Sequence, residues 1–170
     1  MAAHLPRVKA SANEVMSLAA RAARGAGAPP AQASAFGAAA LRHLAAGRAS
    51  EHLSDALNAL PKGPIMTLPA ALTRLLESAQ GPQLSGKLPA HVLSASYAEA
   101  QPFAASFSAT ADGPIVTYDL TAPATKPAAA RVTLPDALAA KLHQLAARTY
   151  VPETESSRLS GAGAGLTDND

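Results

Sequence analysis

Cysteine and tryptophan are absent from this chain of 170 residues, and aromatic residues make up only 4% of it. Without cysteine the chain has no disulfide, no thiolate nucleophile and no Cys-ligated zinc, and it fits a reducing compartment. Because aromatics are scarce, the core must be built from leucine and small side chains, which favours closely packed helices. We therefore expect a cytoplasmic protein with a close-packed helical part.

Long hydrophobic runs are also lacking. No stretch of about 18 apolar residues occurs, so we expect no membrane-spanning helix. Nucleic-acid binding would need a dense basic face with interleaved aromatics, and the basic residues near the N-terminus have none among them. The formal net charge is only +2, with a basic head and an acidic tail. The sequence therefore predicts no nucleic-acid partner and no membrane partner.

Recognisable catalytic motifs are missing as well. The chain has no Gly-x-Ser-x-Gly elbow, no phosphate-binding Gly-x-x-x-x-Gly-Lys loop and no His-Glu-x-x-His. Its histidines are scattered without an i, i+4 pair, and we interpret them as surface or cap residues; they are His4, His43, His52, His91 and His143. The sequence identifies no metal-binding residues and leaves the cofactor unknown, and it leaves open whether the protein is an enzyme.

The first half of the chain is typical of a helical cluster. After a flexible leader at 1–10, the capping box Ser11-Ala-Asn-Glu14 begins a helix that ends near residue 25. A second helix is expected over 30–46, and a third, capped by Ser50, over about 50–60. A fourth should begin with Thr67 and Pro69 and end before residue 81.

In the second half the apolar period changes from about four to two. We expect strands at 93–97, 103–110, 115–121 and 131–134, with Asp112-Gly113 as a hairpin turn. A helix from Pro135 to about 151 should lie on this sheet. The predicted fold is α+β, a single domain at 11–150 with a helical half (11–80) and a sheet-plus-helix half (90–150), in which a small, mostly antiparallel sheet carries a covering helix.

The extended tail at 151–170 is rich in glycine and acid. Gly161, Gly163 and Gly165 could let backbone N–H groups approach an anion, but no lysine follows them, which favours a solvent-exposed tail over a phosphate cradle. Asp168, Asn169 and Asp170 carry oxygen ligands that hard cations prefer, yet adjacent residues rarely converge on one ion. Ser157 and Arg158 could bind a carboxylate.

Two passages carry a family resemblance: Ser11-Ala-Asn-Glu-Val with Arg21-Ala-Ala-Arg-Gly-Ala-Gly, and the closing stretch from Thr149 to Asp170. Together they resemble a family of uncharacterised, mainly alphaproteobacterial proteins, a domain of unknown function. The resemblance implies a bacterial cytoplasmic protein encoded among small-molecule catabolic genes. It also points to the two ends as the functional parts: Arg21, Arg24, Ser157, Arg158, Gly161, Gly163, Gly165, Asp168 and Asp170.

Two function hypotheses follow. In the first, the protein is a non-catalytic accessory or interaction module of a small-molecule catabolic pathway, and its tail docks near Arg21 and Arg24 or on a partner subunit, including a second copy. In the second, it is a small-molecule enzyme or ligand-binding protein in which Arg21, Arg24 and Arg158 meet the glycine-rich tail and hold a carboxylate or phosphate.

Overall fold

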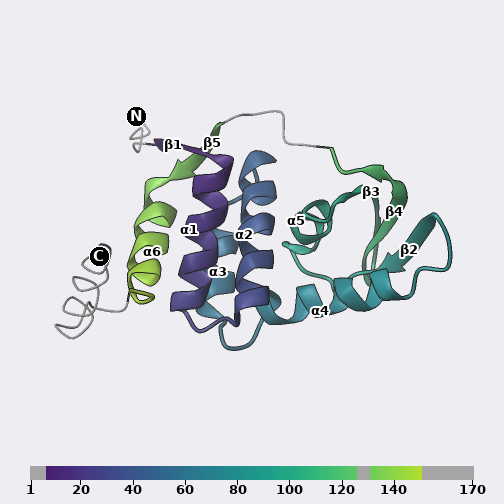
Figure 1. Cartoon of the computed structure of the whole chain (residues 1–170), viewed down its shortest axis with the longest axis horizontal. Helices are drawn as coiled ribbons and strands as arrows, with labels where there is room; N and C mark the ends of the chain where they lie inside the picture. The colour runs from purple at the N-terminus through teal and green to yellow at the C-terminus, as the bar shows by residue number, and fades with distance from the viewer. Residues whose placement is uncertain (1–6, 126–130, 151–170) are drawn as a thin grey trace, which may run out of the picture.

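The computed structural model describes residues 7–125 and 131–150. In chain order the elements are β1 (Arg7–Ser11), α1 (Ala12–Gly25), α2 (Pro30–Ala45), α3 (Glu51–Asn58), α4 (Pro64–Glu77), β2 (Gln83–Lys87), α5 (Ser94–Glu99), β3 (Phe103–Thr110), β4 (Gly113–Pro123), β5 (Arg131–Pro135) and α6 (Asp136–Ala147). The fold is α+β, with α6, α1 and α2 toward one end and the antiparallel β2-β4-β3 sheet, flanked by α4 and α5, toward the other (Figure 1).

Helices α6, α1 and α2 lie side by side, with α1 in the middle (Figure 1). The predicted capping box begins α1: Glu14 N–H donates to Ser11 Oγ at 3.3 Å, and Ser11 N–H donates to Glu14 Oε2 at 2.6 Å. Small side chains let these helices approach closely. A Cβ placed on Gly37 of α2 would lie 2.5 Å from the carbonyl oxygen of Met16 on α1, which confirms that glycine is needed at this contact.

The hairpin predicted around Asp112-Gly113 is confirmed. β3 and β4 pair antiparallel with Thr110 opposite Gly113, whose φ of +119° is the left-handed conformation that glycine adopts readily. β2 pairs with the other edge of β4, so the strand order is β2-β4-β3. The sequence does not predict this strand, because it contains Ser85-Gly86 and lacks clear alternation.

Residues 7–10, expected to belong to a flexible leader, instead form β1 with Ser11. β1 pairs antiparallel with β5, Ser11 opposite Arg131 and Arg7 opposite Pro135, in a separate two-stranded sheet. The leader prediction was wrong for these residues because their partner strand lies far along the chain. The short strand predicted at 131–134 is confirmed, but it does not join the hairpin sheet.

The strand predicted at 93–97 is a helix, α5. Leu93 and Tyr97 are buried, and their spacing of four satisfies a helix as well as an alternating strand. Local hydrogen bonds favour the helix, since Tyr97 N–H donates to Leu93 C=O at 3.0 Å and Ser94 Oγ–H donates to Pro89 C=O at 2.7 Å. It is α5 that packs against β3 and β4.

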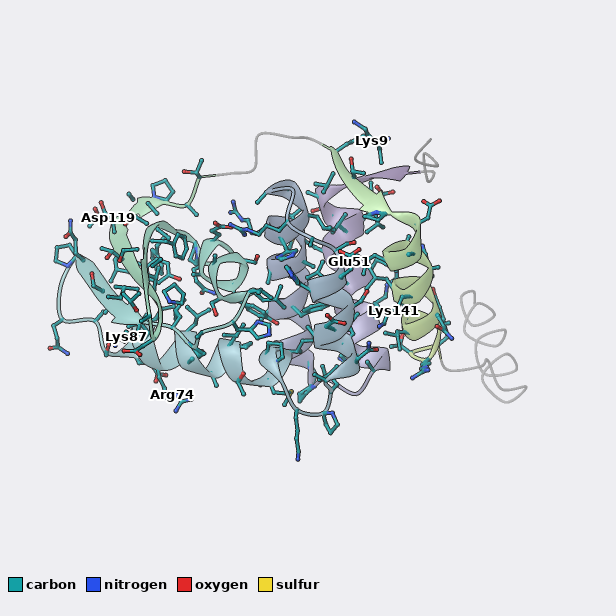
Figure 2. The ribbon with its side chains drawn as sticks, turned by 180° about the vertical axis from the view of Figure 1, so that it is seen from behind. Lys9, Glu51, Arg74, Lys87, Asp119 and Lys141 are labelled. Atoms are coloured by element: carbon teal, nitrogen blue, oxygen red, sulfur yellow. The ribbon has the colours of Figure 1, made fainter. Side chains whose placement is uncertain are left out.

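Three further expectations need correction. α4 begins at Pro64, so Pro69 lies inside the helix instead of at its first position. The Ser50 side chain makes no capping hydrogen bond to α3. α6 packs on α1 and contacts α3 instead of covering the three-stranded sheet; its Lys141 Nζ donates to Ser54 C=O at 3.0 Å and to Asn58 Oδ1 at 2.7 Å (Figure 2).

Within the parts of the chain that the structure describes, none of the helices has the length and apolar character needed to cross a membrane.

Candidate functional site

A groove of about 750 Å³ lies between α1 and α6, below the β1–β5 pair. We call it the α1–α6 groove. Its floor is apolar, with Ala10, Leu18, Leu134 and Ala139, and polar side chains stand along its length. The polar residues are Lys9, Asn13, Glu14, Ser17, Arg21, Asp136 and His143. An apolar floor with a polar rim suits an extended peptide segment or a small amphipathic molecule.

Arg21 stands at the lower end of the groove. Its Nη1 donates to the hydroxyl of Tyr150 at 3.2 Å, which joins α1 to the residue where the described chain ends after α6. Both side chains are exposed, and Tyr150 is 68% exposed. The chain therefore leaves α6 beside Arg21, the one arginine among the described residues that lines this groove.

Charge changes along the α1–α6 groove. Both helices begin at the β1–β5 end, so the groove has carboxylates at one end and Arg21 at the other (Figure 1). Hydrogen bonds from the Ser11 backbone and side chain hold the pKa of Glu14 below its usual value. Asp136 Oδ1 is buried and has no hydrogen-bond partner in the described structure. Lys9, a residue of β1, lies at this upper end too (Figure 2).

Of the site residues that the sequence predicts, two are described by the structure, and one of them lines the groove. Arg21 lines the α1–α6 groove, whereas Arg24, one turn later on α1, is exposed and does not line it. The remaining predicted residues lie outside the described residues; they are Ser157, Arg158, Gly161, Gly163, Gly165, Asp168 and Asp170.

A buried polar network joins α2 to α5. His43 on α2 has no exposed surface, and its Nδ1 lies 2.8 Å from the hydroxyl of Ser96 on α5. Arg48 Nη1 donates to the same hydroxyl at 2.9 Å. The Arg48 guanidinium also forms a two-point ion pair with Glu99, at 2.6 and 2.7 Å. The interpretation of the histidines as surface or cap residues is therefore wrong for His43.

The partners fix the proton positions in this network. The Ala49 carbonyl oxygen only accepts, so His43 Nε2, which lies 2.8 Å from it, carries a proton and donates to it. In the neutral imidazole Nδ1 then has no hydrogen, so the Ser96 hydroxyl, which accepts from Arg48, donates to Nδ1. Burial is the main cause that lowers the pKa of His43, and the charge of Arg48 acts in the same direction. The imidazole is thus held neutral.

A serine hydroxyl bonded to a neutral imidazole is the arrangement of a nucleophile and its base. Here, however, Ser96 and His43 both have 0% exposed surface, so a substrate cannot reach the hydroxyl. The network instead fixes α5 on α2. Within the described residues, no group of three or more His, Asp or Glu side chains is arranged to hold a metal ion.

Periodicity could have located His43 but not its partners. Phe36, Ala40, His43 and Leu44 occupy one face of the predicted second helix, and all four are buried. A histidine on that stripe is expected to be buried. Ser96 could not be assigned as its partner, because 93–97 reads as a strand with Ser96 on the solvent side.

No known protein family, no curated protein and no solved structure matches this chain. The resemblance to the alphaproteobacterial family therefore stays a prediction, and the site has to be interpreted from its own residues.

Proposed function

We propose that the protein is an accessory or interaction module without catalytic activity of its own, and that its C-terminal tail, residues 151–170, docks in the α1–α6 groove of the same chain. The observation that carries this proposal is the groove itself, with an apolar floor, Arg21 at one end and carboxylates at the other. A partner that carries a similar segment would compete with the tail for the groove.

The order of charges in the tail matches the order of charges in the groove. Leaving Tyr150 beside Arg21, the chain reaches Glu153 and Glu155 first and Arg158 next. Three extended residues, Glu155 to Arg158, span about 10 Å. The seven helical residues from Arg21 to Glu14 also span about 10 Å. A tail that runs up the groove would therefore set Glu155 against Arg21 and Arg158 against Glu14.

Tethering makes the intramolecular arrangement the favoured one. A segment joined to α6 by a few residues has an effective concentration of the order of millimolar near the groove. Even a weak contact is then substantially occupied. The exposed charges contribute modestly and are screened by salt, so we expect docking to weaken as ionic strength rises.

The test uses paramagnetic labelling of the full chain. Because the chain contains no cysteine, a nitroxide attaches only at the cysteine that is introduced. A nitroxide on Ser160→Cys should broaden the amide resonances of Asn13, Ser17 and Ala139 and leave those of β3 unchanged. A nitroxide on Gln80→Cys, on the exposed connection after α4, serves as the matched control.

Charge reversal identifies the pairing. Arg21→Glu should remove the broadening, Glu155→Arg should remove it as well, and the double variant should restore it. Equal broadening in the groove and in β3, for every variant, would contradict the proposal. Mixing isotope-labelled chains with separate nitroxide-bearing chains tells docking within one chain from exchange between copies.

A second candidate function is recognition of a small carboxylate or phosphate by Arg21 and Arg158 together with the glycine-rich tail. The placement of Arg21 on a cavity of about 750 Å³ favours it, because this volume suits a small molecule. Titration of the full chain with citrate and with inorganic phosphate would then shift the groove resonances, and Arg21→Ala and Arg158→Ala would each abolish the shift.

The wider setting rests on the resemblance and on composition. We place the protein in a bacterial cytoplasm, as a partner of small-molecule catabolic enzymes, with no nucleic-acid partner. The absence of cysteine fits that compartment. Capture of such an enzyme by the full chain, and its release by a peptide of residues 151–170, would test this setting.

A further inference from the structure

Strand β3 forms one edge of the three-stranded sheet, and no described element pairs with its outer side. Natural sheets protect their edges with short strands, charged residues or prolines. The other edge, β2, has only five residues and ends at Lys87. In contrast, β3 has eight residues, none of them charged or proline, and its residues 106–110 are exposed. The β3 edge is therefore open to a further strand.

The central strand β4 bonds to its two neighbours through alternate residues. On the β2 side, Leu88 N–H donates to Pro114 C=O at 2.9 Å, and Leu120 N–H donates to Pro82 C=O at 2.8 Å. Backbone groups point to opposite sides at successive residues of an antiparallel strand. The even-numbered residues of β4 therefore bond to β2, and the odd-numbered residues bond to β3.

The register shows which backbone groups of β3 point away from the sheet. Over residues 104–110 of β3, even-numbered residues lie opposite odd-numbered residues of β4, as Ser106 lies opposite Thr117. The odd-numbered residues of β3 therefore direct their N–H and C=O groups outward. These residues are Ala105, Phe107 and Ala109, and no described residue outside the sheet bonds to their backbone.

The sequence of this edge is palindromic. Residues 105–109 read Ala-Ser-Phe-Ser-Ala, with Phe107 at the centre. If two such strands pair antiparallel about a two-fold axis at Phe107, alanine lies opposite alanine, serine lies opposite serine, and no charges meet. Because Phe107 itself directs both of its backbone groups outward, the axis falls on a hydrogen-bonded pair. The edge is thus self-complementary, as a two-fold interface requires.

The Phe107 side chain is apolar surface that a second copy would cover. It shares a face of the sheet with Val116, which lies opposite it in the register, and with Tyr118, whose hydroxyl donates to Ala98 C=O of α5. Val116 has no exposed surface, whereas Phe107 is 38% exposed, since β3 has no described neighbour on its outer side. Aromatic side chains that meet across neighbouring strands stabilise a sheet.

We propose that β3 is a self-association edge, through which two copies of this chain pair antiparallel about a two-fold axis at Phe107 and join their sheets in the order β2-β4-β3-β3-β4-β2. The palindrome favours a second copy over an unrelated strand, which would have no reason to be centred on Phe107. The contact is small, so the dimer is weak, with a Kd of roughly 0.1 mM. This surface is separate from the α1–α6 groove, and the proposal does not rest on tail docking.

Sedimentation equilibrium of the full chain from about 20 µM to about 1 mM measures the association. The chain should be mainly monomeric at the low end of this range and mainly dimeric at the high end. Amide hydrogen exchange at the two concentrations locates the contact. The amides of Ala105, Phe107 and Ala109 should gain protection in the concentrated sample, whereas those of Ser106 and Ser108, which bond to β4, should be protected in both.

Two double variants at the same exposed positions test the register, because the axis sets position 106 opposite position 108 of the copy. Ser106→Lys/Ser108→Lys sets like charges opposite each other and should weaken the dimer at least about tenfold at low ionic strength. Ser106→Lys/Ser108→Glu sets opposite charges together and should keep the dimer or tighten it. Thermal unfolding of dilute samples checks that both variants fold alike.

Three results would overturn the proposal. The first is a native chain that remains monomeric at about 1 mM. The second is a dimer that leaves the amides of Ala105, Phe107 and Ala109 unprotected, because association would then use another surface. The third is an equal Kd for the two double variants, which would exclude the two-fold pairing at Phe107.

Discussion

At the residue scale, Ser96 joins the buried imidazole of His43 to the part-buried guanidinium of Arg48. Its hydroxyl accepts from Arg48 and donates to His43, so its removal leaves an imidazole nitrogen without a donor inside the protein. We expect Ser96→Ala to lower the free energy of unfolding by about 1–3 kcal/mol, measured by urea denaturation.

Ser85→Ala is the control for this prediction, because Ser85 also bonds a second side chain, the hydroxyl of Thr117, but is exposed. It should change the free energy of unfolding by no more than about 0.5 kcal/mol. Equal effects at the two positions would mean that burial of the Ser96 network contributes nothing.

Individual residues were predictable where their role is local. The capping box of Ser11 and Glu14 needs only a spacing of three, and the structure confirms it. Arg21 was singled out with Arg24, but only the three-dimensional path of α6 decides that Arg21 lines the groove and meets Tyr150. The pairing of His43 with Ser96 joins positions 53 apart, which no local pattern specifies.

At the scale of elements, the contact between α1 and α2 depends on Gly37. Alanine has the better helix propensity by about 1 kcal/mol, so an exposed Gly→Ala change in a helix would stabilise. Here the added Cβ would come within 2.5 Å of the Met16 carbonyl oxygen and 3.1 Å of the Ala20 Cβ. We expect Gly37→Ala to destabilise the protein by about 1–3 kcal/mol in urea unfolding, because the helices must separate.

Gly81→Ala provides the matched comparison. A Cβ at Gly81 has no atom within 4 Å, and its φ lies outside the left-handed region. The free energy of unfolding should therefore change by less than about 0.5 kcal/mol. If Gly37→Ala were as neutral as Gly81→Ala, the close approach of the two helices would be refuted.

Elements were easier to predict from the sequence when they are long or are joined by a characteristic turn. The β3–β4 hairpin has Asp112-Gly113 and two runs of alternating residues, and it was predicted correctly. The stretch 93–97 is too short to separate a period of two from a period near four, so the sequence predicts a strand where the structure has α5. β2 and β1 depend on partners that are distant in sequence, which local composition does not reveal.

At the scale of the whole molecule, the His43 network lies where the helical layer meets the sheet half, so its protonation affects the entire fold. Burial lowers the pKa of His43 from its usual 6.5 in the folded protein, whereas the unfolded chain keeps the ordinary value. Below about pH 6.5 the unfolded state binds a proton that the folded state resists. Stability should therefore fall as pH decreases through this region, by at most about 1.4 kcal/mol per pH unit for one histidine.

The measurement is urea unfolding at about pH 7.5 and about pH 5.5, in the native chain and in His43→Gln. His91, whose pKa is also lowered by burial, acts in the same direction, so the variant should reduce the loss without removing it. Glu14 and Asp119 have lowered pKa values and lose their contributions only under more acidic conditions. An identical pH dependence in both proteins would show that His43 is not the titrating group.

The β1–β5 pair finally imposes an order on synthesis. Ser11 and Arg131 are partners about 120 positions apart, which at 5–20 residues per second corresponds to roughly 6–25 s of synthesis. During that interval α1 and α2 can already pack together. β1 stays unpaired and the side of α1 that faces α6 stays uncovered until β5 and α6 have been synthesised. The α1–α6 groove is thus completed only after α6 has been synthesised, and a nascent chain displays an apolar face of α1 to cellular chaperones until then.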